Sequence, residues 1–167
     1  MLSLVLLHAA LAADPAAEVQ ALLTGTFRLA ESAAEIPPRL DAATERAIAS
    51  LFIAFRPLAK YKLRPEVQPC PSWHIALTAT HFSNHCGTGE DFQVPVEGSR
   101  TVYDDGDPYK ATVMVGTRSV KLDIMGEAGG KTTSWKVAAD ERVSVYTAIV
   151  SQHLAEPLAW TTWYVRE

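Results

Sequence analysis

The sequence has few cysteines, no excess of positive charge and, beyond its first residues, no long hydrophobic run. It has two cysteines among 167 residues, and their spacing fits no zinc-binding motif. Lys and Arg number 15 against 19 Asp and Glu, the net charge is −4, and the pI is near 5.7. Nucleic acids and anionic membrane surfaces attract basic patches, so this balance argues against both as partners. After residue 12, no run approaches the roughly 20 apolar residues that span a bilayer.

Sequence signatures of catalysis are also missing. No G-x-S-x-G nucleophile motif, G-x-G-x-x-G dinucleotide motif or P-loop occurs in the chain. We therefore predict no catalytic residues and no cofactor. An isomerase-type or haem-dependent enzyme is retained as the least favoured alternative.

Potential metal ligands are present without a metal-binding pattern. His81 and His85 lie four residues apart and, together with His74, could bind zinc, copper or haem. No Asp, Glu or Cys stands at a suitable spacing to complete such a site. The acidic run at residues 104–107 surrounds a glycine as calcium loops do, but it lacks their closing glutamate. We predict surface histidines, a solvated acidic turn and no metal site.

The N-terminal stretch has the composition of a signal peptide. Residues 1–12 are apolar and end in small residues that suit signal peptidase, although the stretch contains no Lys or Arg. We predict a signal peptide at 1–12, a single domain at 13–167, and a periplasmic or secreted protein. The alternative is an apolar N-terminal helix packed on the core.

The two cysteines fit an exported protein. Cys70 and Cys86 flank an apolar run, and an isolated pair in an oxidising compartment usually forms a disulfide. We predict this disulfide, with two buried thiols as the alternative.

Alternating apolar residues dominate the segment Tyr109–Val165. Val120, Leu122 and Ile124, for example, alternate with polar residues, which is the period of a strand. Five such runs joined by short turns predict an antiparallel meander. With the shorter runs at residues 25–103 the chain has about ten strands. We therefore predict a mainly β fold, a closed or nearly closed antiparallel barrel of about 8–10 strands.

One substantial helix is predicted after the first strand, at Leu40–Arg56. Its apolar residues recur at spacings of three and four and include Phe52 and Phe55. Such a broad apolar face predicts burial against the sheet, or a position as a lid over a cavity. The flanking segments are predicted as a linker at residues 31–38 and a strand at Leu58–Leu63.

The last two predicted strands have no polar face. In the first of them, Val143 and Val145 lie on one face, and Tyr146 and Val150 lie on the other. Because a barrel wall normally presents a polar outer surface to water, one of these faces must be covered. The predicted helix is the simpler cover, and the partner subunit of a homodimer is the alternative.

Two short motifs resemble those of the calycins, the lipocalins and fatty-acid-binding proteins. The run at Leu22–Leu29 resembles their G-x-W opening strand, with Phe27 in place of Trp. The ending Trp163–Arg166 is similar to the calycin last strand, whose arginine packs near the opening aromatic residue. The order of strand, helical segment and meander is closer to the fatty-acid-binding proteins, although their R-x-Y carboxylate clamp is absent in that order. The layout also resembles small exported bacterial lipocalin-like proteins of unassigned function.

A barrel of this size can hold one small ligand in its interior. We predict non-catalytic binding or transport of a small hydrophobic or amphipathic ligand, which requires an enclosed cavity of a few hundred cubic ångströms and which a filled interior would exclude. An exported protein-interaction or inhibitor module is the alternative. Each candidate wall or pocket residue could instead belong to a plain core. The candidates are Phe27, Trp73, Trp135, Tyr146, Trp160 and Arg166.

Overall fold

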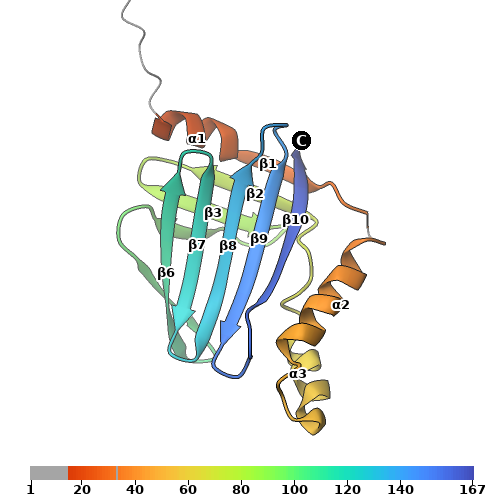
Figure 1. The fold of residues 1–167 in the computed structure, drawn as a ribbon. Helices are drawn as coiled ribbons and strands as arrows, with labels where there is room; N and C mark the ends of the chain where they lie inside the picture. Colours follow the sequence, from red (N-terminus) through yellow and green to blue (C-terminus); the bar gives the residue numbers. More distant parts are fainter. Residues whose placement is uncertain (1–14, 33) are drawn as a thin grey trace, which may run out of the picture.

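The computed structural model describes residues 15–32 and 34–167, which form ten strands and four helices (Figure 1). The helices are α1 (Pro15–Leu23), α2 (Ile36–Ala47), the 3-10 helix η1 (Ile53–Phe55) and α3 (Arg56–Leu63). The strands are β1 (Gly25–Leu29), β2 (Ser72–Leu77), β3 (His81–Cys86), β4 (Phe92–Pro95), β5 (Arg100–Asp104), β6 (Asp107–Gly116), β7 (Ser119–Gly126), β8 (Gly129–Val137), β9 (Val143–Ser151) and β10 (Leu158–Arg166).

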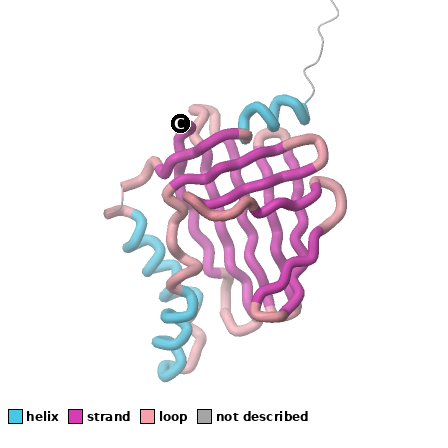
Figure 2. The backbone as a smooth tube through the Cα atoms, turned by 180° about the vertical axis from the view of Figure 1, so that it is seen from behind, coloured by secondary structure: helices cyan, strands magenta, loops and turns pink. Residues whose placement is uncertain are grey.

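The ten strands form one nearly closed antiparallel barrel. Their spatial order is β4-β3-β2-β1-β10-β9-β8-β7-β6-β5, so β1 joins the two parts of the sheet by pairing with both β2 and β10. Strands β6–β10 form one wall, and β1–β3 cross behind it (Figure 1); Figure 2 shows the crossing from the other side. In the described sheet β4 and β5 are the two edges. The predicted meander and the predicted barrel are both confirmed.

The strand register sorts inward-facing residues into rows across the wall. Val120 of β7 lies opposite Trp135 of β8, which lies opposite Val145 of β9. Two rows further on, Lys131 of β8 lies opposite Ile149 of β9. The rows are apolar near α1, and we call that end of the barrel the closed end. The end that contains Lys131 is called the open end.

Helix α2 packs on the inner face of β10. Leu158 and Trp160 alternate along β10 in step with Tyr164, which belongs to the barrel core. Both pack against buried α2 residues such as Leu40. The prediction that the helix covers the outer face of the last strands is therefore wrong, and Tyr146 on that face is 43% exposed. Alternation shows which residues share a face, but it does not show which face points inward.

A helix after the first strand is confirmed, but its bounds differ from the prediction. Helix α2 ends at Ala47, well before Arg56. It begins within the predicted linker, because Pro37 and Pro38 occupy its first positions, where a missing backbone N–H leaves no intrahelical hydrogen bond unmade. Proline thus starts this helix.

The segment after α2 is also helical. The predicted strand Leu58–Leu63 lies within α3, which begins next to Pro57. The change of direction after Ala47 turns Phe52 and Phe55 outward, and they are 69% and 61% exposed. Their predicted burial is wrong. The apolar spacing continues in the sequence, but the helix that it predicted ends at Ala47.

The predicted signal peptide at residues 1–12 lies outside the described residues. In the described part of the chain, no helix has the length and apolar character needed to cross a membrane.

Candidate ligand cavity

Aromatic rings fill the closed end of the barrel. Trp135 packs edge-on against Trp73, with ring centroids 5.2 Å apart and planes at 89°, and it packs against Phe82 at the same centroid distance. Phe27 and Leu23 of α1 belong to the same buried cluster. Helix α1 lies across this end (Figure 1). The closed end is thus a close-packed hydrophobic core.

Arg166 links the last strand to the end of α1. Its guanidinium group donates hydrogen bonds to the carbonyl oxygens of Thr24 at 2.7 Å, Leu22 at 2.6 Å and Ala21 at 3.0 Å. It also lies over the Phe27 ring, 5.0 Å from the centroid. A cation is favourable here because the last carbonyls of a helix lack intrahelical partners and carry partial negative charge. Arg166 thus holds α1 over the closed end.

A disulfide and a buried tyrosine reinforce the same end. Cys70 and Cys86 are joined in a disulfide, with their Cα atoms 5.5 Å apart. The Tyr164 hydroxyl donates a hydrogen bond of 2.9 Å to the Cys70 carbonyl oxygen, and Thr162 donates one of 3.4 Å to the Tyr164 oxygen. Burial raises the pKa of Tyr164 above its usual value.

Buried threonines mark the change from the closed to the open end. Thr133 and Thr147 lie opposite each other in the row after Trp135, and both are buried. Beyond them the next row contains Lys131 and Ile149. The interior therefore becomes more polar from one end of the barrel to the other.

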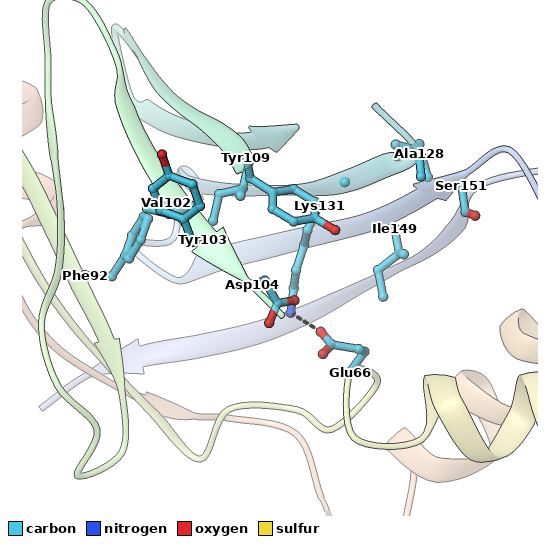
Figure 3. Close-up of a pocket in the computed structure, with 14 residues that line it drawn as sticks. Glu66, Phe92, Val102, Tyr103, Asp104, Tyr109, Ala128, Lys131, Ile149 and Ser151 are labelled. Carbon is cyan, nitrogen blue, oxygen red and sulfur yellow. Dashed lines mark hydrogen bonds and ion pairs between the residues drawn. The ribbon is translucent and has the colours of Figure 1, made fainter. Parts of the chain in front are cut away.

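The open end contains a cavity of about 510 Å³ (Figure 3). It lies between the β5–β6 hairpin, the ends of β7–β9 and the loop after α3. Most of its contact surface is apolar, which suits a ligand with an apolar part. The lining residues are Glu66, Phe92, Val102, Tyr103, Asp104, Tyr109, Ile124, Ala128, Gly129, Gly130, Lys131, Ile149, Val150 and Ser151.

Glycines allow the cavity wall to take its shape. The ring of Tyr109 lies across Gly126, where a Cβ atom would come within 2.8 Å of two ring carbons. A Cβ atom at Gly130 would clash with the carbonyl oxygen of Ile124. The absence of side chains at these two glycines therefore sets both the position of Tyr109 and the close approach of β7 and β8.

An ion pair crosses the mouth of the cavity. The Lys131 ammonium nitrogen of β8 lies 3.1 Å from Oε2 of Glu66, in the loop after α3 (Figure 3). Both side chains are about half exposed, so solvent screens the pair, and it contributes on the order of 0–1 kcal/mol. The pair joins the helical segment to the barrel without fixing it strongly.

The six residues predicted to form a wall or pocket lie outside the lining of this cavity. The described lining of the cavity includes none of them. Their packing makes most of them part of the framework that shapes the barrel. Phe27, Trp73 and Trp135 lie at the closed end, Trp160 lies under α2, Tyr146 lies on the outer face, and Arg166 covers Phe27.

Two of the three histidines considered as metal ligands are neighbours in the structure. His74 and His85 lie opposite each other on β2 and β3, with stacked rings 4.3 Å apart. The His85 ring contacts Asp91 at 2.6 Å, and His81 contacts Thr80 instead. Across residues 15–32 and 34–167, no group of three or more His, Cys, Asp or Glu residues is placed to hold a metal ion.

The position of the cavity was not predicted from the sequence, although one signal of it was present. Lys131 precedes Thr133 and Trp135 by even steps, so it faces inward with them. A charged residue at an inward position indicates a solvated or functional part of a barrel, because burying an unpaired charge is costly. The residues from β5 and from the loop after α3 carry no such periodic signal.

No family model and no characterised protein sequence matches this chain. Solved structures do match. A fatty-acid-binding protein from Manduca sexta has a TM-score of 0.51 and 18% identity, covering 86% of this chain and 98% of that one. A fatty acid transporter, REP1-NXSQ, has a TM-score of 0.51 and 14% identity, covering 86% and 95%.

A third similar structure is an abundant heat soluble (SAHS) protein from Ramazzottius varieornatus. It has a TM-score of 0.53 and 10% identity, covering 87% of this chain and 96% of that one. Identities this low establish a shared fold and nothing finer. The chain shares the barrel fold of these structures, which is the fold that the calycin resemblance predicted.

Proposed function

We propose that this protein binds a small hydrophobic or amphipathic molecule, without catalysis, in the cavity at the open end of its barrel. The observation that carries the proposal is the cavity itself, about 510 Å³ in volume with a mostly apolar lining. Pockets for small molecules fall in this range and combine apolar walls with a few polar groups. Binding would bury the apolar part of the ligand, and Lys131, Glu66 and Asp104 would contact its polar part.

Two further observations support the proposal. Similar folds include one named as a fatty acid transporter and one named as a fatty-acid-binding protein. Both tryptophans of the main core cluster, Trp73 and Trp135, lie at the closed end, and the open end contains the cavity, so the barrel is not filled throughout.

We also propose that the protein works outside the reducing cytosol, in the periplasm or as a secreted protein. The Cys70–Cys86 disulfide supports this location, because such bonds persist in oxidising compartments.

A neutral fluorescent probe, N-phenyl-1-naphthylamine, tests the binding function. We expect saturable fluorescence enhancement with one probe per chain. Ile124→Trp places a larger side chain in the cavity and should abolish the enhancement. Met114→Trp, on an exposed part of β6, is the matched control and should retain it. Equal loss in both variants, or binding unaffected by either, would place the probe outside the cavity. Circular dichroism checks that both variants fold.

A further inference from the structure

The charged residues that line the cavity carry a net negative charge. Glu66 and Asp104 are acidic. Lys131 is the one basic residue among the described lining residues, which include no arginine or histidine. Lys131 lies 3.1 Å from Glu66, so these two opposite charges offset each other in the count. Asp104 therefore stands as the excess charge at the mouth.

The β5–β6 hairpin extends this negative charge beyond the lining. Asp104 lies opposite Asp107 at the end of the hairpin, and Asp105 lies in the turn between them. Asp105 has φ of 49° and Gly106 has φ of 91°, which folds the turn tightly and keeps the three carboxylates close along the chain. An anionic head group at the mouth would meet this field and be repelled by it.

Aromatic rings line the same part of the cavity. Phe92, Tyr103 and Tyr109 lie on one side of it, and Tyr109 points its ring toward the interior (Figure 3). Aromatic faces attract cations, and alkylated ammonium groups are recognised by several rings together with a carboxylate. Tyr109 and Asp104 provide a ring and a carboxylate on the same side of the cavity, with Phe92 of β4 also in the lining, whereas the Tyr103 side chain is 73% exposed.

One cation already lies against these rings from outside the lining. The Arg100 guanidinium carbon is 5.4 Å from the centre of the Phe92 ring. Its NH1 group donates a hydrogen bond of 2.7 Å to the Gln93 carbonyl oxygen, which holds it at the β4 edge. Arg100 therefore already contacts the Phe92 ring, and it is a cation beside the cavity with which an anionic head group could pair.

We infer that the cavity selects an amphipathic molecule with a cationic head group, such as an alkylammonium compound, over a carboxylate. The apolar tail lies between Ile124 and Ile149, and the head group lies near Asp104 and the aromatic rings. This inference rests on the proposed function, because it assigns the ligand class of the same cavity.

Three probes that share one tail test the inference: dodecyltrimethylammonium, dodecanol and dodecanoate. Calorimetric titration below the micellar concentration of each gives their affinities. We expect the ammonium compound to bind roughly tenfold more tightly than dodecanoate, with dodecanol between them. Asp104→Asn should lower the ammonium affinity roughly tenfold and leave dodecanol binding unchanged. Asp105→Asn, in the same turn but outside the lining, is the matched control and should change neither.

The outcomes separate the inference from the proposed function. Tightest binding of dodecanoate, weakened by Arg100→Gln or Lys131→Met, would overturn the cationic head group while leaving a ligand-binding cavity in place. Equal affinities for all three probes would also overturn it. If no probe binds and N-phenyl-1-naphthylamine also fails to bind, the proposed function itself fails.

Discussion

The two ends of this barrel are built from the same strands but differ in how their inward residues pack. At the closed end, the inward residues of β7–β9 are large and apolar, and Trp135 sits among other aromatic rings. At the open end, the same strands contribute glycines, Lys131 and Ile149 around a cavity. The closed end therefore carries most of the folding stability, and the open end has room for a ligand. Stability and binding should respond independently to substitutions at the two ends.

The largest expected effect is at the closed end. Trp135→Ala removes a fully buried ring and should lower the free energy of unfolding by about 3–5 kcal/mol. Tyr109→Ala, at the open end, should cost about 1 kcal/mol, because that ring already borders a cavity. Urea unfolding measures both. Similar losses for the two variants would show that the open end is packed as tightly as the closed end.

The disulfide gives the next largest effect. Replacing both Cys70 and Cys86 with Ser should lower stability by about 3 kcal/mol, since the bond closes a loop with a sequence separation of 16. The affinity for N-phenyl-1-naphthylamine should not change, because neither residue lines the cavity. A large loss of affinity in a variant that remains folded would contradict the independence of the two ends.

Tyr164→Phe should have an intermediate effect that depends on pH. Loss of the hydrogen bond to Cys70 should cost about 1 kcal/mol near neutral pH. The native pKa of Tyr164 is raised above the unfolded value of about 10, so the unfolded chain loses this proton first as pH rises. The stabilisation is complete below about pH 10 and falls as pH increases toward the native pKa.

Unfolding free energies measured from neutral to alkaline pH test this prediction. The Tyr164→Phe variant should show a shallower alkaline decline than the wild type. Tyr146→Phe, which changes an exposed tyrosine, should follow the wild-type slope. If the unfolding free energy falls with pH at the same slope in all three proteins, ionisation of Tyr164 does not cause the alkaline decline.

Glu66→Gln should change stability little and binding more. The Lys131–Glu66 pair is exposed, so its loss should cost less than about 1 kcal/mol, and less still at high salt. Freeing Lys131 should improve dodecanoate binding relative to the ammonium probe. Thermal unfolding and calorimetry follow the two effects, and an unchanged ratio of the dodecanoate and ammonium affinities would exclude Lys131 from head-group recognition.

The smallest effect is expected outside the barrel. Replacing Phe52 and Phe55 with Ser should change the free energy of unfolding by about 0.5 kcal/mol or less for each residue, because both rings are exposed. Phe27→Ser, at the buried closed end, is the contrasting variant. A large loss on changing Phe52 would indicate that this ring is packed in solution.

Much of the fold could be predicted from the sequence. Alternation in β6–β10 gave the meander, because a strand has a side-chain period of two whatever it packs against. The disulfide partners were defined because the chain has two cysteines. The end of α2 could not be predicted, since the apolar spacing continued past Ala47 into Phe52 and Phe55 while the backbone changed direction.

The candidate site was less predictable than the fold. Large aromatic residues were expected to line the pocket, but rings such as Trp135 gain most from burial and so packed together. The cavity lies where β8 contributes Gly129, Gly130 and Lys131 instead of large apolar residues. Glu66, in the loop after α3, also lines the site, and no local sequence pattern marks such a long-range contact.

The sequence by itself determined the antiparallel meander of β6–β10, the two cysteines that could pair, and the residues that share each strand face. Those features follow from local geometry, which repeats every two residues in a strand. Tertiary structure alone decided which face of β10 receives α2, which end of the barrel is filled, and that Glu66 meets Lys131 across the cavity mouth. These depend on how distant segments pack, and packing is set by the shapes and volumes of side chains that meet only when the barrel closes.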